Sequence, residues 1–269
     1  MSFSSQIEIG LRCYAQAFRL LFTSKLFIFL LSPIFIAIVL FTVGFYFSSY
    51  FTGIIYSQIN DYFQNIDVPS YISSILNVVL HGIVFILIRL FFFLIFVYFG
   101  SFVILMVLSP VFSILSEKVE EMVLNTFYPF DILKLLKDIG RSLILVTRNF
   151  IYQLLWFIII WLITLFLSFI PLINIIAGFM GQIILFLIVS YFYGFSFMDY
   201  SNERRGISIQ QSVKIMRSYR WLVITIGAVF CICLYIPYIG TFLASFMAIV
   251  SVVAATLGYI EIHKKTNDT

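Results

Sequence analysis

Charged residues are scarce in this sequence. Aspartate, glutamate, lysine and arginine make up 10% of its 269 residues, against about 25% in an ordinary globular domain. Hydrophobic residues supply 62% of the chain, and 33 residues are phenylalanine. So few polar side chains exclude a soluble protein built around a single core. The composition predicts an all-α integral membrane protein in contact with the lipid bilayer.

Cysteine and histidine are also scarce, with three and two copies. His81 and His263 lie far apart in the sequence and the cysteines form no CxxC pair, so no spacing typical of a metal site is present. The sequence also has no phosphate-binding loop and no nucleophile–base arrangement. We therefore expect no enzyme activity, no metal and no cofactor. The net charge of +4 follows from membrane topology and does not predict nucleic-acid binding.

Two uncharged runs, 150–198 and 221–260, are each too long for one membrane helix, which needs about 20 apolar residues. Each run contains a proline in similar surroundings, FIPLI around Pro171 and YIPYI around Pro237. Proline favours the first turn of a helix and moves the preceding residue out of the helical conformation. Both runs are therefore predicted to be helical hairpins with a proline at the tip.

The other apolar segments predict one interfacial helix and two full spans. In 5–23, apolar residues recur every three or four positions opposite a polar face, which is typical of a helix lying in the membrane interface. Arg89 interrupts the second predicted span, and we expect it to reach the headgroups. All elements are assigned to one membrane domain, 1–269: the interfacial helix 5–23, the spans 26–50 and 75–108, and the hairpins 150–198 and 221–260.

Basic residues are distributed unevenly along the chain. Every lysine and arginine except Arg89 lies in the N-terminal part, in 109–148, in 199–220 or in the C-terminal tail, and 51–74 has none. The positive-inside rule then places both termini in the cytoplasm and the hairpin tips on the outer side. The arm 221–236 would be only about 24 Å long, against a hydrocarbon core of about 30 Å. The hairpins are therefore either partly penetrating, or complete spans in a six-helix protein.

Four segments carry a family resemblance: LSPVFSILSEKVEEMV (108–123), FIPLINIIA (169–177), FMDYSNERRGIS (197–208) and YIPYIGTFLA (235–244). Their order resembles that of the CysZ-type sulfate permeases, within the wider etoposide-induced-protein family. The resemblance implies a multi-pass protein of the cell inner membrane that forms a homo-oligomer and takes up sulfate or a related oxyanion for cysteine synthesis.

One substitution supports a second interpretation. Phe27 and Ile28 stand where the characterised permeases of this family carry an arginine pair implicated in sulfate binding. The alternative is therefore a membrane structural or interaction protein on the same scaffold that transports nothing.

An oxyanion needs hydrogen-bond donors and positive potential, which basic side chains and helix N-termini both supply. The second arm of each hairpin begins near its proline, so its positive end would lie at the tip. The alternative is that the tips only make tight turns. The residues predicted to contact the anion are Lys25, Arg89, Pro171, Asn174, Pro237, Gly240 and Thr241.

The acidic and basic residues that follow the first hairpin have two interpretations. The two arginines of the ERRG sequence could gather anions at the cytoplasmic face. Arginines at a membrane edge are also common for topological reasons, and they pair with carboxylates. We therefore predict a cytoplasmic ion-pair network made of Glu117, Glu120, Asp199, Glu203, Arg204 and Arg205.

Overall fold

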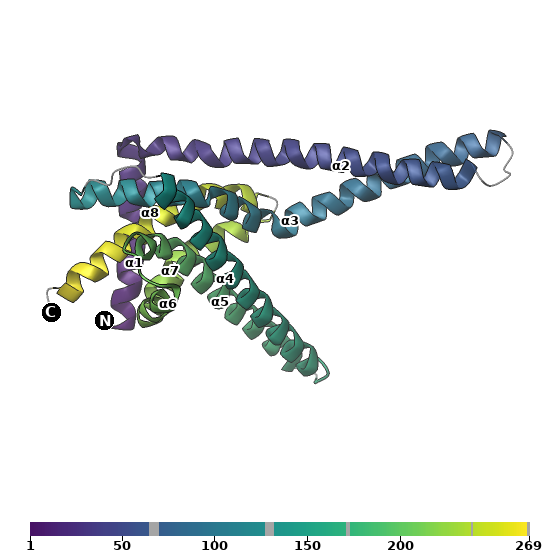
Figure 1. Ribbon diagram of the computed structural model, residues 1–269. Helices are drawn as coiled ribbons and strands as arrows, with labels where there is room; N and C mark the ends of the chain where they lie inside the picture. The colour runs from purple at the N-terminus through teal and green to yellow at the C-terminus, as the bar shows by residue number, and fades with distance from the viewer. Residues whose placement is uncertain (65–69, 127–131, 171–172, 238, 268–269) are drawn as a thin grey trace. The chain divides into compact units, whose positions relative to one another are not determined.

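The computed structural model describes residues 1–64, 70–126, 132–170, 173–237 and 239–267, with the backbone alone at some of these positions. These residues form helices and no strand (Figure 1), which confirms the predicted all-α membrane fold. The helices are α1 (Phe3–Thr23), the 3₁₀ helix η1 (Lys25–Leu31), α2 (Ser32–Gln64), α3 (Ser70–Leu124), α4 (Ile132–Leu167), α5 (Ile173–Arg204), α6 (Ile209–Ser218), α7 (Arg220–Leu234) and α8 (Gly240–Asn267).

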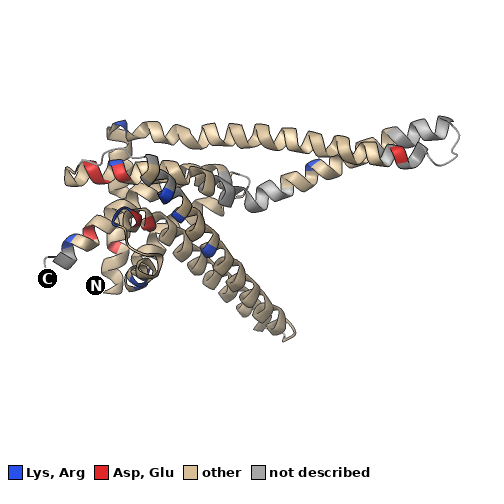
Figure 2. Cartoon of the chain, viewed as in Figure 1, with Lys and Arg blue, Asp and Glu red and all other residues tan. Residues whose placement is uncertain are grey.

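Within the described residues, four helical stretches are long and apolar enough to cross a membrane: Lys25–Gln58, Gly140–Leu167, Ile173–Arg204 and Phe242–Lys264. A fifth candidate is the pair α6 and α7, which meet at a bend of 92°. Figure 2 shows that α4 and α5 carry no charged residue along the part of their hairpin nearest the tip. The backbone of 75–108 is helical, but many of its side chains lie outside the described residues.

The chain divides into two compact units, one made of Ile34–Ile104 and the other of Met1–Pro33 with Leu105–Thr269. The first unit is a hairpin of α2 and the beginning of α3. Aromatic side chains join its two arms, with the Phe51 and Phe92 ring centroids 5.9 Å apart. That both units form a single membrane domain stays a prediction.

The larger unit has α8 at its centre. In an 18-residue apolar window within Phe242–Lys264, 89% of the residues are buried inside the protein, because α1, α5 and α7 pack around this helix. The corresponding value for the 18-residue window within Gly140–Leu167 of α4 is only 6%. Two helices of similar composition therefore have different surroundings: α8 forms a protein core, whereas α4 leaves most of its surface available to lipid.

The N-terminal helix α1 packs on the α7–α8 pair through the face that carries Ile9, Cys13, Tyr14, Ala17 and Leu21, whereas Leu11, Phe18 and Phe22 are exposed. The Tyr14 hydroxyl donates a hydrogen bond to the Ile226 carbonyl oxygen at 2.5 Å and lies 2.7 Å from Ser251 Oγ. Gln6 Oε1 accepts from the backbone N–H of Trp221 at 3.2 Å. This contact caps α7, whose first N–H groups have no partner within their own helix. The predicted amphipathic helix is therefore also anchored to the protein.

Helices α5 and α7 approach each other closely at two glycines. A Cβ atom on Gly194 would lie 1.9 Å from the Val223 carbonyl oxygen, and one on Gly227 would lie 1.8 Å from the Ser190 carbonyl oxygen. Glycine has no Cβ, so the two backbones can touch, as is common where helices pack in membranes. This crossing fixes the position of α7, and of the bend before it, against α5.

A local sequence signal explains where α6 begins, and α3 is longer than predicted. Helix α6 begins with a capping box, in which Gln211 N donates to Ser208 Oγ and Ser208 N donates to Gln211 Oε1. Helix α3 continues past Pro110 to Leu124, beyond the predicted end of the span at 108. One face of 108–120 is buried, with the Phe112 ring 6.2 Å from that of Phe197.

Candidate functional site

Asp199 of α5 organises a buried polar cluster. Its carboxylate accepts hydrogen bonds from Arg141 of α4 at 3.1 and 3.2 Å and another from Ser212 of α6. Arg141 also donates to the carbonyl oxygen of Ile207, in the turn before α6. The Asp199 side chain is 5% exposed, so its charge depends on these partners. The cluster joins α4, α5 and α6 at one end of the α4–α5 hairpin.

A second cluster surrounds Glu120 of α3. Its two carboxylate oxygens bind Arg204 at 2.6 Å and Arg205 at 2.5 Å. Arg204 also donates to Ser116 Oγ at 2.9 Å, and this hydroxyl lies 2.7 Å from Thr256 Oγ1 of α8. The side chains of Glu120 and Arg204 are only 2% and 3% exposed. Both arginines of the ERRG sequence are thus engaged by a carboxylate, a geometry that favours a structural role for them.

The other residues of the predicted network lie close to these two clusters. Glu203 Oε2 accepts from Ser142 Oγ at 3.3 Å, and Asn202 Oδ1 accepts from the Tyr259 hydroxyl at 2.6 Å. Glu117 is partly buried on the same helix as Glu120. The polar side chains around the end of α5 therefore connect α3, α4, α6 and α8.

The residues predicted to contact an anion are placed in separate parts of the structure. Lys25 is exposed at the start of η1, and Asn174 is exposed in the first turn of α5. Pro171 and the side chain of Thr241 lie outside the described residues. No hydrogen bond or ion pair among the described side chains joins Lys25 to either hairpin tip.

Arg89 belongs to the unit Ile34–Ile104. Its guanidinium carbon lies 4.5 Å from the ring centroid of Phe45 and 4.7 Å from that of Phe85. Its Nη2 donates to Ser49 Oγ at 3.4 Å. Aromatic faces therefore stabilise this arginine by cation–π contact.

The turn between α7 and α8 is tight. The Ile239 N–H donates to the Pro237 carbonyl oxygen at 2.8 Å, and Pro237 itself is exposed. A Cβ on Gly240 would lie 2.3 Å from the Leu234 carbonyl oxygen. Gly240 is thus required where the chain reverses direction, which agrees with the tight-turn interpretation of this tip.

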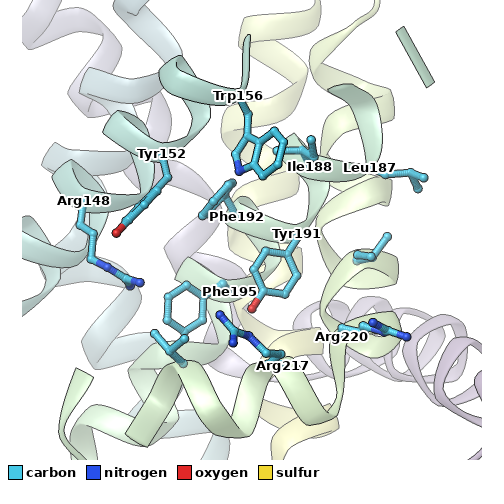
Figure 3. Close-up of a pocket in the computed structure, with 12 residues that line it drawn as sticks. Arg148, Tyr152, Trp156, Leu187, Ile188, Tyr191, Phe192, Phe195, Arg217 and Arg220 are labelled. Atoms are coloured by element: carbon cyan, nitrogen blue, oxygen red, sulfur yellow. The ribbon is translucent and has the colours of Figure 1, made fainter. Parts of the chain in front are cut away.

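A cleft of about 550 Å³ lies between α4, α5, α6 and α7 (Figure 3). Three arginines line it: Arg148 of α4, Arg217 in the last turn of α6 and Arg220 at the start of α7. The other lining residues are aromatic or aliphatic, and none is acidic: Tyr152, Trp156, Leu187, Ile188, Tyr191, Phe192, Phe195, Val213 and Ile224.

The cleft has a cationic end and an apolar end. Figure 3 shows the three arginines along one edge and Trp156, Leu187 and Ile188 at the other. The guanidinium carbon of Arg148 lies 5.2 Å from the Tyr152 ring centroid. Its Nη1 atom is buried and has no hydrogen-bond partner among the described residues. The arrangement offers positive charge and N–H donors beside an apolar wall.

Sequence reasoning missed this cleft, although one signal pointed towards it. Arg148 and Arg220 each stand just before one of the two long uncharged runs. The positive-inside rule explains such arginines one at a time. Only the packing of α4 and α7 against α5 brings them to one cleft.

Residues 13–245 match the model of a protein family described as sulfate transporter CysZ/etoposide-induced protein 2.4. The match begins in α1 and ends near the start of α8, so it includes the first hairpin, the residues around Asp199 and Glu120 on α3 to α6, and the arginine-lined cleft. A comparison with curated proteins found no match. The predicted family resemblance is confirmed: the chain belongs to the sulfate transporter CysZ/etoposide-induced protein 2.4 family.

Proposed function

We propose that this protein is a permease for sulfate or a related oxyanion. It acts in the cell inner membrane as a homo-oligomer, with both termini in the cytoplasm. The observation that carries the proposal is the family match over residues 13–245. The match covers most of the chain, including three of the four described helical stretches able to cross a membrane, Lys25–Gln58, Gly140–Leu167 and Ile173–Arg204.

Lys25 supports the proposal as a cation next to a membrane span. Its side chain is exposed, and the apolar stretch Lys25–Gln58 begins at this residue. A lysine attracts an oxyanion as a point charge and supplies three N–H donors. In this proposal Lys25 contacts the anion where it enters or leaves the membrane.

The hairpin tips supply positive potential of a second kind. Neither α5 nor α8 has an acidic residue in its first turn, so no local carboxylate neutralises the positive end of either helix dipole. Asn174 is exposed in the first turn of α5 and can donate through its side-chain amide. We infer that the anion passes this tip during transport.

The test is uptake of radiolabelled sulfate into liposomes that contain the purified protein. We expect saturable uptake, reduced by excess unlabelled sulfate, with sulfite, phosphate and chloride added in turn to define selectivity. Lys25→Ala should lower uptake about tenfold, because it removes a charge-assisted hydrogen bond. Lys214→Ala, which removes an exposed cation from α6, is the matched control and should leave uptake unchanged. Uptake no higher than in empty liposomes, from protein shown to be folded, would contradict the proposal.

The second candidate function is a membrane interaction protein that transports nothing. It is favoured by Phe27 and Ile28, whose side chains are 49% and 68% exposed beside Lys25. An exposed apolar pair suits contact with lipid or protein better than contact with an anion. Absence of sulfate flux, together with one partner that co-purifies in stoichiometric amount, would select this function.

A further inference from the structure

We propose that the cleft between α4, α5, α6 and α7 binds an anionic phospholipid. In this assignment the lipid phosphate lies against Arg148, Arg217 and Arg220, and an acyl chain follows the apolar wall. The proposal concerns a different place in the molecule from Lys25 and the hairpin tips, and it does not depend on sulfate transport.

The charge of the cleft favours an anion from outside the chain. Its three arginines have no acidic residue beside them in the lining, and no ion pair within the described part of the protein reaches them. Arg148 Nη1 is buried without a hydrogen-bond partner there, an unfavourable state for a cationic donor. Guanidinium groups match phosphate oxygens well because their planar fork can bind two oxygens at once.

The size and the wall of the cleft favour a lipid over a free oxyanion. A volume of about 550 Å³ is in the range of pockets that hold drug-sized molecules, and is large for one small ion. Trp156 and Leu187 of the wall are 45% and 36% exposed, so an acyl chain can reach them from the bilayer. A hydrated ion would gain nothing from these side chains. A lipid, in contrast, would bind the arginines through its phosphate and the apolar wall through an acyl chain.

The bend between α6 and α7 places the cleft at the depth of lipid headgroups. These helices meet at 92°, so α6 lies along the membrane surface when α7 stands along the membrane normal. Arg217 is in the last turn of α6 and Arg220 begins α7, so the two residues flank the bend. Basic pockets between membrane helices at this depth are typical sites for anionic headgroups. Tyrosine and tryptophan side chains are also enriched at this depth.

Native mass spectrometry of the purified full-length protein, titrated with phosphatidylglycerol or phosphatidylcholine, tests the proposal. We expect one phosphatidylglycerol molecule to be retained in preference to phosphatidylcholine. Arg217→Gln and Arg148→Gln should each weaken its binding about fivefold. Lys214→Gln removes the same charge from an exposed position of α6 outside the cleft and should have no effect. Arg217 is exposed, so we expect Arg217→Gln to fold. This variant therefore tests the proposal even if Arg148→Gln does not fold.

Two competitors separate a bound lipid from a free oxyanion. Sulfate and glycerol 3-phosphate offer a similar tetrahedral anion without an acyl chain, and at millimolar concentration neither should displace phosphatidylglycerol. Displacement by either one would make the cleft a site for free oxyanions and would overturn the lipid assignment. Equal retention of the two phospholipids would overturn it, and so would equal weakening by Lys214→Gln and Arg217→Gln.

Discussion

Replacing Gly194 by alanine should separate α5 from α7. The new Cβ would lie 1.9 Å from the Val223 carbonyl oxygen, whereas real Cβ contacts are almost never shorter than 3.0 Å. The oxygen would therefore have to withdraw by about 1.1 Å, the difference between these two distances. Because it belongs to the backbone of a helix, no side-chain rotation can relieve the clash. The whole of α7 would have to shift.

The expected cost comes from overpacking and from lost contacts along the crossing. Inserting a methyl group into a packed core costs about 1–3 kcal/mol, and a backbone clash belongs at the upper end. A further loss arises because a gap of 0.5–1 Å removes a quarter to a half of the dispersion energy of each contact. Alanine offsets about 1 kcal/mol of this cost, because it favours a helix over glycine. We expect about 3 kcal/mol in total, which corresponds to a fall in Tm of about 6–12 °C for a protein of this size.

Thermal unfolding of the purified protein in detergent, followed by intrinsic tryptophan fluorescence, measures this effect. Gly178→Ala is the matched control, because it lies on the same helix and its Cβ would meet no atom within 4 Å. Alanine favours a helix interior over glycine by about 1 kcal/mol, so Gly178→Ala should leave Tm unchanged or raise it slightly. Equal Tm values for Gly194→Ala and Gly178→Ala would refute the close crossing of α5 and α7.

Three further predictions concern buried groups. Glu120→Gln should destabilise the protein by about 3 kcal/mol in the same unfolding assay, because it leaves two arginines without their buried counter-charge; an unchanged Tm would contradict the ion-pair geometry. Tyr14→Phe should cost about 1–3 kcal/mol, because the Ile226 carbonyl oxygen loses its donor from α1; a cost below 0.5 kcal/mol would show that α1 is not anchored there. Burial raises the pKa of the Cys13 thiol from its ordinary 9.0 to about 12, with a smaller contribution from Glu261. The reactive thiolate should therefore be roughly a thousandfold rarer at pH 8 in the folded protein than in the unfolded protein. In a variant with Cys13 as its sole cysteine, maleimide labelling should be slow until a denaturing detergent unfolds the chain, and equal rates in the folded and unfolded states would refute the burial of Cys13.

The breaks between the helices could be predicted because their signals are local. The first long uncharged run divides between Leu167 and Ile173, and the second divides between Leu234 and Gly240. A proline lies within each gap, and its effect on the preceding residue acts without any tertiary contact. The amphipathic pattern of the N-terminal helix is local in the same sense, and the structure has this helix over Phe3–Thr23.

The surroundings of each apolar helix could not be predicted, because hydropathy does not distinguish a helix in contact with lipid from one packed inside the protein. The windows in α4 and α8 both qualify as membrane spans, yet 6% of one and 89% of the other is buried inside the protein. Helix α6 (Ile209–Ser218) lies within 199–220, a section for which no helix was predicted. Its capping pair, Ser208 and Gln211, was a readable signal of a helix start.

Among the polar groups, the sequence predicted an ion-pair network but not the cleft. Opposite charges near the end of α5 suggested a network, and the structure places Glu120 between Arg204 and Arg205. The cleft depends instead on Arg148 of α4 meeting Arg217 and Arg220, which lie far from it along the sequence. No spacing rule connects such residues, because their meeting follows from the crossing of α5 with α7 and the bend after α6.

Passive sulfate flux through the purified protein is the most direct test of the proposed oxyanion permease. Liposomes that contain it would be given a sulfate gradient alone, with no nucleotide and no other ion gradient, and the sulfate inside would be measured over time. We expect sulfate to enter down its gradient, at a rate that saturates as the external concentration rises. Folded protein that admits no more sulfate than protein-free liposomes would contradict the assignment as an oxyanion permease.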